Sequence, residues 1–186
     1  MVHLHTLWLP ILLSSVCVFF LSFLFHTVLP IHKNDMDAVP KEDQVMASLR
    51  SFNIPPGDYM IPRPTGPNPM KDAAHMAKVN AGPNVLLTVM KPGPFNMAPT
   101  LGIWFIYLLG VSVVVAYVCS RAVQAGAPYL QVFRFAGVTA FASYALAQWQ
   151  ESIWFQRRWS TTIKNNLDGL IYALFTAGIF GAMWPR

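Results

Sequence analysis

Apolar residues gather into four long runs that are nearly free of charged side chains, and this pattern sets the predicted architecture. Arg134 and Asp168 are the only Asp, Glu, Lys or Arg residues within these runs. Each run has close to the roughly 20 residues that an α-helix needs to cross about 30 Å of hydrocarbon. We therefore expect an all-α membrane protein built as a four-transmembrane-helix bundle, with spans at 7–29, 99–119, 130–149 and 165–184.

The first run is interpreted as a retained helix and not as a cleaved signal peptide. A signal peptide begins with a basic segment and ends at a small-x-small cleavage site. No Lys or Arg precedes Leu7, and the run ends in Phe25-His26-Thr27-Val28-Leu29. Neither feature of a signal peptide is therefore present.

The segment 30–98 is expected to be a long extramembrane loop between the first and second spans. Val45, Leu49 and Phe52 repeat at helical spacing, which predicts an amphipathic helix over about 40–52. Turn signals and apolar stretches predict a short helix at about 69–79 and strands at about 59–62 and 85–90. The loop should thus carry a small helix-plus-hairpin element.

Seven of the nine methionines lie in or beside this loop, which raises a copper-binding alternative together with His32 and His75. The methionines do not repeat at a spacing of three or four residues. We therefore interpret them as packing residues of a small, irregular core. His3 and His5 form a His-x-His pair, but the sequence shows no third ligand beside them.

Positive charge predicts the orientation, because cytoplasmic loops of membrane proteins are enriched in Lys and Arg. The long loop and the 150–164 loop together hold ten Lys and Arg residues, whereas the opposite side holds Arg121 and Arg186. We expect both loops in the cytoplasm and both termini on the outer, periplasmic side.

Small residues at helical spacing predict how the helices pack, since they allow close approach of helices in a membrane. We expect these faces to pack inside the bundle, with a dimer built on one of them as the alternative. The fourth run carries Gly169, Ala173, Ala177 and Gly181, and the third carries Ala136, Ala140, Ser143 and Ala147.

The segment 150–164 is expected to be an interfacial loop rich in Trp and Arg. Indole rings are amphipathic and Arg pairs with lipid phosphate, so such a segment is typical of the headgroup layer. A ligand or partner site on this loop is the alternative. The expected anchors are Trp149, Trp154, Arg157, Arg158 and Trp159.

Ionisable residues within membrane spans are candidate functional residues. His26 ends the first span, Gln148 and Glu151 end the third, and Asp168 begins the fourth. All four belong to the long-loop side, so they could meet at the membrane boundary and relay protons or hold a metal ion. The alternative is that they cap helix ends or pair with the basic residues of the adjoining loop.

Composition and motifs narrow the function. Charged residues make up 11% of the chain, whereas soluble domains carry about 25%. The sequence has no phosphate-binding glycine loop and no Gly-x-Ser-x-Gly, Cys-x-x-Cys or His-Glu-x-x-His motif. We expect no catalytic site, no cofactor, no metal ion and no nucleic-acid partner. The expected partners are the lipid bilayer and another membrane protein or a second copy of this chain.

Four segments resemble a family of small, uncharacterised, four-helix bacterial inner-membrane proteins. They are LPIHKND after the first run, PPGDYMIP in the loop, YLQVFRFAGV in the third run and DGLIYALFTAGIFG in the fourth. The resemblance covers nearly the whole chain. It implies a multi-pass protein of the bacterial inner membrane, and it implies no activity, cofactor or site residue.

The leading functional hypothesis is a non-enzymatic accessory, assembly or stability factor for a membrane complex, which would act through the two loops. One alternative is a small oligomeric transporter or channel. A second is a lipid-modifying membrane enzyme, which requires His26 within hydrogen-bond reach of Asp168 or Glu151 because proton transfer needs contact or one bridging water.

Overall fold

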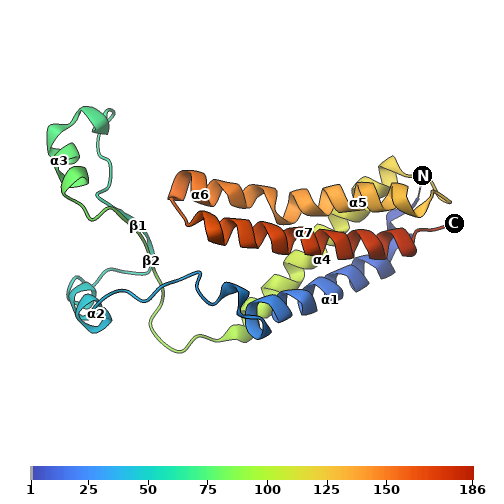
Figure 1. Ribbon diagram of the computed structural model, residues 1–186, viewed down its shortest axis with the longest axis horizontal. Coiled ribbons are helices and arrows are strands. Elements are labelled where there is room, and N and C mark those ends of the chain that lie inside the picture. The colour runs from blue at the N-terminus through green and yellow to red at the C-terminus, as the bar shows by residue number, and fades with distance from the viewer. Residues whose placement is uncertain (1) are drawn as a thin grey trace. The chain divides into compact units, whose positions relative to one another are not determined.

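The computed structural model describes residues 2–186, and the chain divides into two compact units (Figure 1). The helical unit comprises the residues up to Met36 together with Asn96–Arg186, and the loop unit comprises Asp37–Phe95. The long helices of the helical unit are α1 (Trp8–Phe23), α4 (Met97–Ala122), α5 (Tyr129–Tyr144) and α7 (Trp159–Ala182).

Three helices of the described residues are long and apolar enough to cross a membrane, at Leu4–Val28, Met97–Ala122 and Tyr129–Phe155. The first is α1 extended by a 3-10 turn at Leu4–Leu7 and a π-helical turn at Leu24–Val28. The structure is thus mostly helical, as expected, and three of its helices could span a membrane. Helix α7 is equally long, but its first half is polar and it is not among the three.

The loop unit contains the expected elements with shifted bounds. Helix α2 is Glu42–Ser51, and strand β1 (Gly57–Ile61) pairs antiparallel with β2 (Val85–Val89). The short helix expected at 69–79 is instead a 3-10 turn at Pro69–Lys71 followed by α3 (Ala73–Ala81). The two pieces separate because the Asp72 carboxylate accepts a hydrogen bond from the Ala74 amide, which caps a new helix.

The prediction that the methionines of the loop form a small core was wrong. Met46, Met60, Met70 and Met90 are exposed, and Met70 and Met90 are 74% and 76% accessible. A two-stranded sheet with two short helices offers too little surface to cover them. The methionines therefore form part of the unit's surface.

The helix expected at 130–149 is interrupted, because the helical stretch Tyr129–Phe155 consists of α5, a 3-10 turn and α6 (Trp149–Phe155). Helix α5 ends at Tyr144, and Leu146–Gln148 forms a 3-10 turn. The hydroxyls of Thr139 and Ser143 each donate to the carbonyl four residues before, a pattern that bends helices. The Gln148 side chain then donates to the Tyr144 carbonyl (2.8 Å), which stabilises the break.

The segment expected as a loop at 150–164 is helical, which corrects that prediction. Helix α6 (Trp149–Phe155) ends where Gln156 adopts a left-handed conformation, and α7 begins at Trp159, six residues before the expected start of the fourth helix. The buried hydroxyls of Ser152 and Thr162 lie 2.6 Å apart and join α6 to α7. The segment is therefore the tip of a helical hairpin.

The small residues lie mainly where α5 packs against α7, side by side in Figure 1. Ala136, Ala140, Ala173 and Ala177 are buried, and so is Gly169. The two glycines are closely packed. A Cβ added at Gly169 would lie 2.9 Å from Ala145 Cβ, and one added at Gly181 would lie 2.7 Å from the Tyr129 ring. Ser143 is half-buried, whereas Ala147 lies in the 3-10 turn and is exposed, because the break at Tyr144 takes it off the helix face.

Three buried serines join α1 to α4. The Ser112 hydroxyl oxygen lies 3.0 Å from the hydroxyl oxygens of both Ser14 and Ser15, and all three side chains are inaccessible to solvent. Hydrogen bonds between helices replace the hydrophobic driving force that lipid does not supply.

Replacing Ser112 with alanine should therefore destabilise the protein by about 1 kcal/mol, since interhelical hydrogen bonds in membrane proteins average about 0.6 kcal/mol each. Thermal unfolding in detergent measures the loss. Ser120→Ala is the matched control on the same helix, because Ser120 donates to the Tyr117 carbonyl of its own helix. Equal unfolding temperatures for the two variants would contradict the prediction.

Candidate functional site

The end of α1 positions His26. Residues Leu24–Val28 form a π-helical turn, in which the Leu29 amide donates to the Leu24 carbonyl at 2.9 Å. Such turns are rare and occur frequently at functional sites. The His26 Nδ1–H donates to the Ser22 carbonyl (3.1 Å), which fixes the ring and leaves Nε2 directed away from the helix backbone.

The turn after α1 brings a second histidine, His32, against the ring of His26. Pro30 begins a short 3-10 turn, Pro30–His32, and the imidazole ring of His32 stacks on that of His26 with centroids 4.3 Å apart and planes within 4°. The His32 Nδ1–H donates to Asp35 Oδ2 at 2.6 Å. Its ring is therefore held from one edge and packed on one face.

Helix α7 supplies the partners of this pair. Asp168 Oδ2 lies 2.8 Å from His32 Nε2 and 3.9 Å from His26 Nε2. One helical turn earlier, the Lys164 ammonium donates to Asp35 Oδ1 at 2.7 Å. Lys164, Asp35, His32, Asp168 and His26 thus form one connected network, which we call the His–Asp network.

Asp35 is held in its ionised form by its partners in the network. Partial burial alone would raise the pKa of the Asp35 carboxyl, but hydrogen bonds from Lys164 and His32 outweigh it and hold that pKa below its usual value. Asp35 is therefore ionised at neutral pH.

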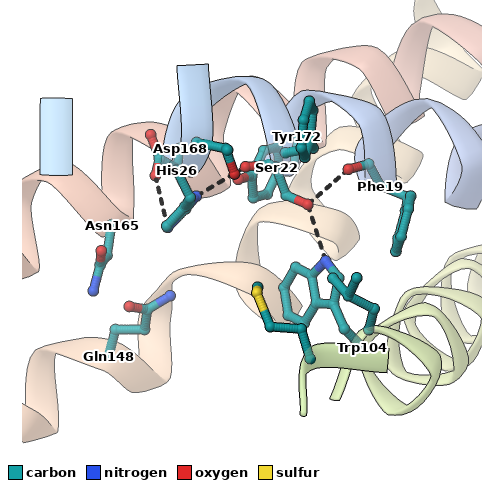
Figure 2. Close-up of a pocket in the computed structure, with 12 residues that line it drawn as sticks. Phe19, Ser22, His26, Trp104, Gln148, Asn165, Asp168 and Tyr172 are labelled. Atoms are coloured by element: carbon teal, nitrogen blue, oxygen red, sulfur yellow. Dashed lines mark hydrogen bonds and ion pairs between the residues drawn. The ribbon is translucent and has the colours of Figure 1, made fainter. Parts of the chain in front are cut away.

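A cavity of about 560 Å³ opens beside the network, and Figure 2 shows the residues that line it. Aromatic and aliphatic side chains from α1 and α4 form most of its wall, including Phe19, Phe23, Leu101 and Trp104. The polar side chains in the lining are Ser22, His26, Thr27, Gln148, Asn165 and Asp168, and Tyr172 lines it as well. The cavity therefore combines a long apolar wall with a group of polar side chains.

Two residues of the cavity lining carry hydroxyl groups in different states. Ser22 donates to the Phe19 carbonyl and accepts from the Trp104 indole N–H at 3.0 Å (Figure 2). Tyr172 is 5% exposed, and its hydroxyl is buried without a hydrogen-bond partner. The Tyr172 hydroxyl is therefore closed to a ligand in the cavity.

The structure brings together three of the four residues expected to form the polar cluster. His26, Gln148 and Asp168 line the same cavity. Glu151 does not line it, because it lies on α6 beyond the break, where it pairs with Arg157 at 3.8 Å. Asp168 is the tenth residue of α7 and not near its start, since α7 begins at Trp159.

The sequence did not predict that His32, Asp35 and Lys164 join His26 and Asp168. His32 was considered only as a copper ligand, and helical periodicity stops at Pro30, so it gives no position for the residues of the turn that follows the first span. Two signals were present: Pro30 at the first position of a turn, and a His-x-x-Asp spacing that puts the side chains of His32 and Asp35 on one side of it.

The expected headgroup anchors are all exposed and lie on or beside the α6–α7 hairpin. The rings of Trp149 and Trp159 approach to 6.1 Å, and Trp154 is 75% accessible. Arg157 and Arg158 occupy the connection between the helices. Anchoring in the headgroup layer stays a prediction.

The network also has the atoms that a metal ion needs. His26 Nε2, His32 Nε2 and an oxygen of Asp168 converge, and a set of ligand atoms from these three residues lies within 4.8 Å of one another. Imidazole and carboxylate are ligands of divalent transition metals.

Comparisons with known proteins add no assignment. The chain matches no protein-family model, no curated protein and no solved structure. The resemblance to a family of bacterial inner-membrane proteins therefore stays a prediction, and the function is inferred from the site alone.

Proposed function

We propose that this chain is a four-span membrane protein that binds an amphipathic, lipid-like ligand at the loop end of its helical bundle. The observation that carries the proposal is the cavity of about 560 Å³, with its apolar wall and its polar side chains. Ligand pockets of this size commonly combine a mostly apolar lining with a few polar groups that fix orientation.

Helix α7 is the proposed fourth span, because its burial pattern is that of a helix surrounded by lipid and other helices. Its polar residues Asn166, Asp168 and Thr176 are buried against the bundle. Its outer face is apolar and exposed, with Leu167, Leu170, Leu174 and Phe175. Polar groups inside and apolar groups outside are typical of a transmembrane helix. Helix α7 also packs against α1 and α5, two helices of the proposed membrane bundle.

Cysteine labelling tests this topology. In a background without Cys17 and Cys119, Ser160→Cys in the first turn of α7 and Arg186→Cys after its end should react with an impermeant maleimide on opposite sides of the membrane. Ser160 should be protected in intact cells, because the cationic loops predict a cytoplasmic long-loop side. Labelling of both positions from the same side would contradict a fourth span.

The ligand class follows from the two parts of the lining. An acyl chain suits the apolar side chains of α1 and α4, because it can make close dispersion contacts with them. A headgroup with hydroxyl or ester oxygens suits the amides of Gln148 and Asn165. The bacterial inner membrane that the resemblance implies would supply such lipids directly to the bundle.

Lipid analysis of the purified protein tests the binding proposal. After purification in mild detergent, organic extraction and mass spectrometry should find about one lipid per chain, enriched in particular species relative to the membrane extract. A bound fraction with the same composition as the bulk extract would mean that the cavity is filled nonspecifically, and the proposal would fail.

The separation of 3.9 Å between His26 Nε2 and Asp168 Oδ2 is longer than a hydrogen bond, so the two residues do not meet the geometric condition set for a lipid-modifying enzyme. Lipid binding is the step that such an enzyme shares with a lipid carrier. We therefore propose binding as the function and assign no reaction.

An accessory role for the loop unit is a second candidate, and the exposed methionines favour it. Methionine is flexible and polarizable, and it is common on surfaces that adapt to several partners. Met46, Met60, Met70 and Met90 are all exposed on this unit. Affinity purification in mild detergent should then recover a defined partner, whereas a clean monomer would count against this candidate.

A further inference from the structure

We propose that His26, His32 and Asp168 form a binding site for a divalent transition-metal ion, with Zn²⁺ as the best match. This inference deepens the proposed function, because it rests on the same end of the cavity and names what that end carries. Metal binding can nevertheless be measured without any lipid.

The distances suit a shared ion. Two ligand atoms on a tetrahedral Zn²⁺ lie about 3.3 Å apart, given metal–nitrogen and metal–oxygen distances of about 2.0–2.1 Å. The observed separations from Asp168 Oδ2 are 2.8 Å to His32 Nε2 and 3.9 Å to His26 Nε2. The two values bracket the required one. The parallel stack of the two rings must also open, because each Nε2 lone pair lies in the plane of its own ring. His26, with a side chain 51% exposed, is the ring that has room to turn.

The two histidines have the hydrogen-bond acceptors that metal-binding histidines usually have. A ligating imidazole usually donates its other N–H to a carboxylate or a backbone carbonyl, which fixes the tautomer. His32 Nδ1 faces Asp35 at 2.6 Å, and His26 Nδ1 faces the Ser22 carbonyl at 3.1 Å. Both rings therefore present Nε2, the atom directed at Asp168. Lys164 in turn holds Asp35 in place at 2.7 Å.

The position of the site completes the argument. His26 and Asp168 also line the large cavity, and His26 and His32 line a smaller hollow of about 370 Å³. Three protein ligands beside open space leave a fourth position for water or a ligand, as in catalytic zinc sites.

The competing occupant of the same place is a proton. His32 can donate to Asp35 and Asp168 together only if the ring carries protons on both nitrogens. A doubly protonated His32 leaves His26 Nε2 without a partner. Its ring lies 4.3 Å from that of His32, and a positive charge on both rings would be repulsive. A metal ion instead uses both Nε2 atoms at once.

Zinc titration of the full-length protein tests the site. The protein in mild detergent is stripped with a chelator, and Zn²⁺ alone is titrated in competition with a chromophoric chelator. We expect one Zn²⁺ per chain. His26→Ala and His32→Ala should each weaken binding by at least 100-fold, and Asp35→Asn by about 10- to 100-fold, as for other residues that orient a ligating histidine.

Two controls separate this site from other histidines. His75→Ala removes a buried histidine of the loop unit, and the double variant His3→Ala/His5→Ala removes the pair near the N-terminus. Both should leave Zn²⁺ affinity unchanged. Thermal unfolding of each stripped variant shows whether it is folded, and His26→Ala is the safest variant because the His26 side chain is 51% exposed.

The outcomes are distinct. Failure of the folded wild-type protein to bind Zn²⁺ between pH 6 and 8 would assign the place to a proton and overturn the proposal, as would binding that survives both His26→Ala and His32→Ala. Lipid content is measured on the same samples. Lipid without metal overturns only the metal site, and metal without enriched lipid overturns only the proposed lipid binding.

Discussion

Replacing Leu101 with tryptophan should reduce the lipid retained by the purified protein at least fivefold and shift the remainder toward shorter acyl chains. Leu101 lies near the start of α4 and forms part of the apolar cavity wall. An indole there would occupy space that a bound chain needs. The bilayer and the detergent are as apolar as the cavity, so the loss comes from overpacking, which costs about 1–3 kcal/mol, or roughly 5- to 150-fold in affinity.

Ile103→Trp is the matched control for this variant. Ile103 lies two residues further along α4, is 68% exposed, and does not line the cavity. It places the same indole on the same helix at nearly the same depth, so both variants should insert into the membrane equally well. Mass spectrometry of extracted lipid then compares the two proteins directly.

Three results are informative. Loss of lipid from Leu101→Trp alone supports binding inside the cavity. Equal loss from both variants would indicate that lipid is held on the outer surface of α4. Unchanged lipid in both would remove the cavity as the binding site, whatever lipid the protein carries.

The helical segments were predictable because their physical cause is local. A run of about 20 apolar residues needs a helix to satisfy its backbone in lipid, and α4 extends only two or three residues beyond each end of the range expected for it. The strands β1 and β2 were also found, because apolar stretches bounded by prolines and glycines are local signals.

The interruptions were not predictable in the same way. The break after Tyr144 depends on Gln148 reaching back to a carbonyl, and the close contact at Gly169 depends on Ala145 lying opposite it. Both involve partners that only the fold brings together. The Trp- and Arg-rich segment was expected to be a loop because its composition suits the headgroup layer, but composition does not decide between a loop and the α6–α7 hairpin.

The site was predicted in part for the same reason. His26 and Asp168 were found because each is an ionisable group within an apolar run. His32 and Asp35 lie in a short polar turn, where ionisable residues are ordinary, and only the stacking of His32 on His26 distinguishes them. Glu151 was included because it lies at the end of the third predicted span, next to Gln148. The break in the helix takes it away from the cavity.

Replacing Gly169 with alanine should destabilise the protein by about 1–3 kcal/mol, although alanine is the better helix former by about 1 kcal/mol. The added Cβ would lie 2.9 Å from Ala145 Cβ and 3.4 Å from the Tyr144 backbone. These are short side chain and backbone atoms, which cannot rotate away. Helices α5 and α7 would have to separate to admit one methyl group.

Gly110→Ala is the matched control, because an added Cβ there meets no atom within 4 Å in the same type of helix. It should be neutral or stabilising by up to about 1 kcal/mol. Gly181→Ala should fall between the two, since its added Cβ meets the ring of Tyr129, a half-exposed side chain that can move. Thermal unfolding of the three variants in one detergent gives the order directly.

The order of these three variants also tests how the site is held. Asp168 directly precedes Gly169, so a separation of α5 from α7 would move the carboxylate relative to His26 and His32. Gly169→Ala should therefore weaken Zn²⁺ binding as well as stability, whereas Gly181→Ala, more than three helical turns away from Asp168, should affect stability alone. Equal stability of Gly169→Ala and Gly110→Ala would show that the packing of α5 against α7 is loose, and that it does not position Asp168.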